Sequence, residues 1–77
     1  MNKFMYDGQE IEIPKISPIG NDKYKIEEGS YSGEIFWMKN FTLSRDMISF
    51  DCESNTDIQE IVLNYVRYLL VRSLEET

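Results

Sequence analysis

The sequence contains no histidine and only one cysteine, and these two absences remove the common routes of catalysis. Without histidine no side chain acts as a base near neutral pH, so a Ser-His or Cys-His pair is excluded. A single cysteine excludes an internal disulfide and, without histidine, leaves little to hold a metal ion. The glycines form neither a dinucleotide-binding motif nor a P-loop. We therefore expect no enzymatic activity, no cofactor and no metal site.

The sequence also lacks an excess of positive charge, a signal peptide and any apolar run near the ~18 residues that span a membrane. Its net charge of −6 argues against a partner bound chiefly through phosphates. We expect a cytoplasmic protein with no membrane partner, for which nucleic acid is a poor ligand. The absence of alanine beside nine isoleucines is a bias that AT-rich codons produce, and it suggests a low-GC bacterium, its phage or another mobile element.

What the sequence does contain is one long periodic segment, 57–74, which predicts a single amphipathic helix. Its apolar side chains fill one broad sector at about 100° per residue. Ser54, Asn55 and Thr56 are the candidate N-caps. The sector is wider than the ~100° stripe that ordinary packing requires, so we expect a single small sheet to leave part of it uncovered. Leu63, Val71 and Leu74 are the residues that we expect to remain uncovered by the sheet.

The runs 2–6 and 9–13 flank Asp7-Gly8, a strong hairpin signal because both turn residues tolerate positive φ. A two-residue loop fixes the register, with Tyr6 opposite Gln9 and Phe4 opposite Ile11. One face of this hairpin then carries Phe4, Tyr6, Ile11 and Ile13, and the other carries Lys3, Met5, Glu10 and Glu12.

Gly29-Ser30 predicts a second two-residue turn, which joins strands within 23–28 and 31–38 and places Tyr24 opposite Ile35. This register turns Tyr24, Ile26, Ile35 and Trp37 inward. It turns Phe36 and Met38 to the opposite face, together with Lys25 and Glu34. The prolines and Asn21-Asp22 make 14–22 a surface connection. Residues 47–52 are predicted as the last strand, with Ile48, Phe50 and Cys52 inward.

The predicted order is therefore ββββα or βββββα, with no βαβ unit. This order favours an α+β fold: an antiparallel four- or five-stranded sheet of hairpins, packed on one face by a single C-terminal helix. Residues 1–77 are short enough to form one small domain.

Two apolar side chains on a charged sheet face are the main functional signal. The predicted partner-binding residues are Met5, Glu10, Glu12, Glu34, Phe36 and Met38, an apolar and methionine-bearing centre with a charged rim. Intramolecular cover by the 39–46 loop is the simpler explanation of why Phe36 and Met38 are apolar on this charged face. We predict a small acidic protein-binding module, a regulator or inhibitor that docks on a larger macromolecule, with homodimerisation as another use of the same face.

Two nucleic-acid readings remain as alternatives. The first is an acidic nucleic-acid mimic that blocks a DNA- or RNA-binding protein, because Glu10, Glu12, Glu27, Glu28 and Glu34 fall on or near one predicted face. A more distant one is a weak single-strand binder, in which lysines are interleaved with aromatic residues. The residues concerned are Lys15, Lys23 and Lys25 with Tyr24 and Tyr31.

Overall fold

The computed structural model describes residues 2–44 and 46–75 of the chain. Its elements are β1 (Asn2–Tyr6), β2 (Gln9–Ile13), β3 (Ile16–Gly20), β4 (Lys23–Ile26), β5 (Ile35–Leu43), β6 (Ile48–Glu53), the 3-10 turn η1 (Thr56–Ile58) and α1 (Gln59–Glu75). The strands form a two-stranded sheet, β1-β2, and a four-stranded sheet in the order β3-β4-β5-β6. All the pairings are antiparallel. The predicted α+β class, with a four-stranded antiparallel sheet and one C-terminal helix, is confirmed.

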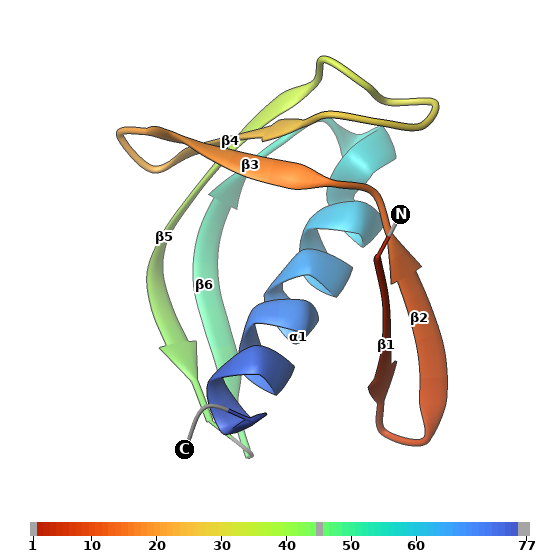
Figure 1. The fold of residues 1–77 in the computed structure, drawn as a ribbon. Helices are drawn as coiled ribbons and strands as arrows, with labels where there is room; N and C mark the ends of the chain where they lie inside the picture. The colour runs from red at the N-terminus through yellow and green to blue at the C-terminus, as the bar shows by residue number, and fades with distance from the viewer. Residues whose placement is uncertain (1, 45, 76–77) are drawn as a thin grey trace.

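The helix α1 lies between two β layers, with the β1–β2 hairpin on one side and the β5–β6 pair on the other (Figure 1). The core is formed where these layers meet, and its buried members are Ile13, Ile26, Phe36, Met38, Ile58, Val62, Tyr65 and Val66. Phe4 of the hairpin meets Tyr68 of α1 edge to face, with 5.6 Å between ring centroids. The wide apolar sector of the helix is thus covered from two sides. Leu63 and Leu74 remain exposed, as expected.

The first hairpin follows its predicted register. Asp7 and Gly8 have φ of 51° and 79°, as a tight hairpin turn requires. Phe4 lies opposite Ile11 and Tyr6 opposite Gln9. The hairpin therefore turns its apolar face to α1 and its charged face to solvent.

Residues 14–22 are more ordered than a surface connection, and this part of the prediction is wrong. Residues 16–20 form β3, which pairs with β4 through a tight turn at Asn21 and Asp22, whose φ values are 52° and 62°. Pro18 is tolerated because β3 is an edge strand, where a missing N–H breaks no ladder. The chain therefore gains a third hairpin that the prolines had concealed.

The second predicted hairpin forms with a register shifted by one residue. Tyr24 lies opposite Phe36 and Lys25 opposite Ile35, whereas a two-residue turn would place Tyr24 opposite Ile35. The connection spans 27–34, and it is closed by hydrogen bonds from the Gly33 N–H to the Ile26 carbonyl (2.8 Å) and from the Ile26 N–H to the Glu34 carbonyl (2.9 Å). A shift of one residue moves every side chain of the strand to the other face.

The predicted faces of β5 are therefore inverted. Phe36 and Met38 are 0% and 1% exposed, whereas Ile35 and Trp37 are 46% and 48% exposed. Phe36 stacks on Tyr24 at 5.4 Å and meets Tyr65 of α1 edge to face at 6.2 Å. The prediction that Ile35 and Trp37 belong to the core is wrong.

The helical segment begins with the 3-10 turn η1 at Thr56, one residue before the predicted start, and α1 follows from Gln59. Asn55, one of the three N-cap candidates, caps η1, and its Oδ1 accepts a hydrogen bond of 3.0 Å from the Asp57 N–H. Asp57 and Glu60 place negative charge in the first turns, where it interacts favourably with the helix dipole. Within 2–44 and 46–75, no helix combines the length and the apolar character needed to cross a membrane.

Candidate functional site

The six predicted site residues do not form one surface. Met5, Glu10 and Glu12 lie on the solvent side of the β1–β2 hairpin, and Met5 is 58% exposed. Glu34 is exposed in the connection between β4 and β5. Phe36 and Met38 are buried beneath the four-stranded sheet, so their predicted exposure is wrong, because the register of β4 and β5 differs by one residue.

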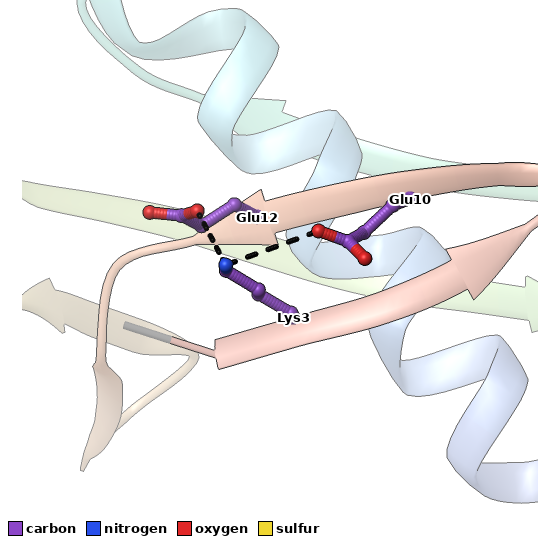
Figure 2. Close-up of polar contacts among 3 residues, drawn as sticks. All are labelled: Lys3, Glu10 and Glu12. Atoms are coloured by element: carbon purple, nitrogen blue, oxygen red, sulfur yellow. Dashed lines mark ion pairs between the residues drawn. The ribbon is translucent and has the colours of Figure 1, made fainter.

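The hairpin side of the predicted site is a charged surface. Lys3 extends between two acids, with its Nζ 3.9 Å from Oε1 of Glu10 and 3.9 Å from Oε2 of Glu12 (Figure 2). All three side chains are well exposed, so each ion pair contributes at most about 1 kcal/mol. Among the residues of this face that the structure describes, Met5 is the one large apolar side chain. Met5 alone offers a partner only a small apolar contact area.

A larger apolar surface lies on the face of the four-stranded sheet that points away from α1. We call it the outer sheet face and define it by seven side chains that the strand pairing places on the same side: Lys23, Lys25, Ile35, Trp37, Lys39, Asp51 and Glu53. Ile35 and Trp37 stand two residues apart on β5 and share this face. The two of them form its apolar centre.

Charged side chains flank this centre in a definite arrangement. Lys23 of β4 and Glu53 of β6 lie opposite Trp37 on its two sides, so one row across the sheet reads basic, aromatic, acidic. The Lys23 ammonium stands over the Trp37 ring, 5.3 Å from its centroid. Such a contact contributes about 0.5 to 1 kcal/mol at an exposed site.

Next to Trp37 the surface is hollowed. An open hollow of ≈ 470 Å³ is lined by Asn21 and Asp22 of the β3–β4 turn and by β5 and β6 residues that include Trp37, Lys39 and Glu53. Lys39 lies opposite Asp51, whose Oδ2 accepts a 2.6 Å hydrogen bond from Asn40 Nδ2. The hollow therefore combines an aromatic wall with carboxylate and ammonium groups. It fits a side chain that carries both apolar and polar atoms.

The sequence signal that leaves the observed register open is the pair of glycines in 29–33. Gly29 and Gly33 have φ of 84° and 96°, a region that other residues rarely adopt. The two-residue turn uses only the first of them. A second glycine four residues on indicates a longer connection, and a longer connection permits the other register.

Cys52 also differs from its prediction. It lies opposite buried Met38, on the α1 side of the sheet, yet it is exposed. The inward direction of its strand position is correct, but little covers it. Over the part of the chain that the structure describes, no group of three or more Cys, Asp or Glu is placed to hold a metal ion.

The arrangement is thus a sheet face with an exposed apolar centre and charged side chains on both sides of it. Comparison of the chain with family models, with curated proteins and with solved structures found no match.

Proposed function

We propose that this chain is a small acidic protein-binding module, a regulator or inhibitor that docks on a larger macromolecule through the outer sheet face. The observation that carries the proposal is the exposure of Trp37 and Ile35, 48% and 46%, side by side on one strand. Adjacent large apolar side chains with a charged rim are typical of interface centres. Tryptophan in particular is enriched among the residues that dominate binding energy.

The charge distribution supports a protein partner better than a nucleic-acid role. A mimic of a phosphate backbone needs acids in an uninterrupted row, but Lys3 lies between Glu10 and Glu12, and three lysines occupy the outer sheet face. A single-strand binder needs the reverse, a basic groove. Asp51 and Glu53 share the face with Trp37 and oppose that use. A protein partner whose surface carries both acidic and basic side chains can pair with the lysines and with the acids of this face.

The proposal includes a cytoplasmic location. Cys52 carries an exposed free thiol, and such thiols persist in a reducing compartment. A second copy of the chain is also a possible occupant of the outer sheet face. Sedimentation of the purified protein separates a homodimer from a monomer that awaits a different partner.

The test compares three tagged proteins as bait in extract of the source cell: the unmodified chain, Trp37→Ser and Met5→Ser. Met5→Ser is the matched control, because it also removes an exposed apolar side chain but from the hairpin. We expect the unmodified chain and Met5→Ser to retain the same protein, identified by mass spectrometry and reconstituted from purified components. Trp37→Ser should lose it. Retention by Trp37→Ser contradicts the proposal.

Ionic strength distinguishes the mimic from the docking module in the reconstituted complex. Binding through an apolar centre changes little between low and physiological salt, whereas binding that replaces a phosphate backbone weakens steeply. A steep loss of affinity would favour the mimic.

A further inference from the structure

The four-stranded sheet ends in two edge strands that differ in their capacity to pair. β3 is interrupted by Pro18 and by a register shift between Pro18 and Gly20, features that block the addition of another strand. β6 runs for six residues with no proline, and its pairing with β5 uses one side only. Among the strands of residues 2–44 and 46–75, the other side of β6 pairs with none, so it is a row of backbone donors and acceptors suited to a further strand.

The α1 side of this edge has an apolar recess. A hollow of ≈ 270 Å³ lies between β6 and the first turns of α1, lined by Phe50, Cys52, Ser54, Gln59, Val62 and Leu63. Cys52 is exposed there although its pairing partner Met38 is buried, and Leu63 is 37% exposed. A strand added beside β6 at the usual spacing of about 4.8 Å would direct every second side chain over this recess. Those side chains should be apolar.

The opposite side of the edge is acidic. Asp51 and Glu53 point to the outer sheet face, where alternate side chains of an added strand would meet them. The hydrogen bond from Asn40 occupies one acceptor site of Asp51 and leaves others on the carboxylate. Basic side chains match this side. Antiparallel self-pairing of two β6 strands about Cys52 is disfavoured, because it places Asp51 opposite Glu53, and like charges directly opposite destabilise a strand pair.

We propose that β6 accepts an extended segment of the partner, whose side chains alternate between apolar residues over the recess and lysine or arginine over Asp51 and Glu53. This inference rests on the proposed function and names the chemistry of the partner. Backbone hydrogen bonds along the edge provide affinity, and the two faces provide selectivity, as in other cases of strand addition. The added strand also extends the outer sheet face on the Glu53 side of Trp37, so one partner contacts both surfaces.

The test uses the full chain, labelled with nitrogen-15, and three synthetic peptides. The first alternates valine and lysine, the second replaces every lysine by glutamate, and the third keeps the charge of the first but carries proline at alternate positions. We expect the first peptide to shift and protect the backbone amides of residues 48–53. The proline peptide should bind about 10-fold more weakly, because it cannot complete the ladder. The glutamate peptide should not bind.

Charge variants separate the edge from general attraction to an acidic protein. Asp51→Asn with Glu53→Gln should weaken binding of the lysine peptide by about 10-fold, because the double variant loses two cross-strand charge pairs. Glu10→Gln with Glu12→Gln removes the same charge from the distant hairpin and should weaken binding by less than about 3-fold. Equal binding of the proline peptide, equal effects of the two double variants, or shifts confined to the hairpin would each overturn the proposal.

The same measurements keep this inference separate from the proposed function. If no peptide binds β6 while Trp37→Ser loses the cellular partner, the edge proposal fails and the docking face stands. If the lysine peptide binds β6 as described while Trp37→Ser retains its partner, strand addition stands and the outer sheet face is not the docking site.

Discussion

Phe36 and Trp37 are adjacent in the chain, yet one is fully buried and the other is half exposed. Phe36→Ala should therefore lower the free energy of unfolding by about 3 to 5 kcal/mol, because it removes a ring that packs against Tyr24 and Tyr65. Trp37→Ala removes mainly an exposed ring above Lys23, and should cost less than about 1 kcal/mol. Urea denaturation followed by circular dichroism measures both. Similar losses for the two variants would show that both faces of β5 are covered.

Two tyrosines, buried Tyr65 and half-buried Tyr24, make the stability of the protein fall at alkaline pH. Burial raises the pKa of Tyr65, and the neighbouring Tyr24 and Tyr68 raise it further. Burial, followed by the charge of Asp22, raises the pKa of Tyr24. A raised pKa means that the unfolded chain loses these protons first as the pH increases. The stability that they contribute is fully present below the ordinary tyrosine pKa of 10.0 and is lost as the pH rises through the raised pKa values of the folded state.

Unfolding by urea from pH 8 to pH 11 tests this expectation. The free energy of unfolding should hold level up to about pH 9 and then fall. Tyr65→Phe should reduce the slope above pH 10, whereas Tyr31→Phe, at an exposed position, should leave the slope unchanged. An unchanged slope in Tyr65→Phe would mean that its hydroxyl is not the group responsible.

At the scale of the elements, two of the hairpins show where sequence reasoning succeeds and where it fails. Asp7-Gly8 allows one short turn, so the register of β1 and β2 and the inward position of Phe4 follow from the sequence alone. The run 29–33 allows more than one turn, and strand β5 is apolar on both faces, so neither local signal chooses between the registers. The choice depends on packing of Phe36 against Tyr65 of α1, a contact between distant segments. For this reason the sequence predicts that strand β5 is apolar on both faces, but it places Ile35 and Trp37 on the buried face instead of the exposed one.

Gly33 lies in the connection that closes the observed register, where its N–H donates to the Ile26 carbonyl, and its contribution can be tested on its own. A Cβ at this position meets no atom within 4 Å, so Gly33→Ala acts only through the backbone, where φ is +96°. The strain should cost about 1 to 2 kcal/mol. Chemical synthesis with D-alanine at this position is the control, because the D-residue favours positive φ, and it should leave stability unchanged or raised. Equal losses for both variants would indicate that strain at Gly33 is not the cause.

At the scale of the whole molecule, the breadth of the apolar sector of α1 was the informative signal. One small sheet was expected to leave some of that sector uncovered, and the structure covers it with the β1–β2 hairpin as a separate layer. The sequence contains both hairpin and helix, but no local pattern states that the hairpin leaves the main sheet. The chain changes direction between β2 and β3 (Figure 1), and Pro14, which has no backbone donor, directly follows β2 there.

Because α1 contacts both sheets, we expect the two sheets to unfold together. Phe4→Ala removes the hairpin ring that packs against Tyr68, and should lower the free energy of unfolding by about 2 kcal/mol, less than for a fully buried ring. Native-state hydrogen exchange measures this loss amide by amide. The loss should be equal, within error, for the slowest amides of the hairpin and for those of β4. Met5→Ala, on the exposed side of the same strand, should leave the exchange rates of both groups of amides unchanged. If Phe4→Ala accelerates exchange in the hairpin alone, the hairpin opens as an independent unit and α1 does not couple the two sheets.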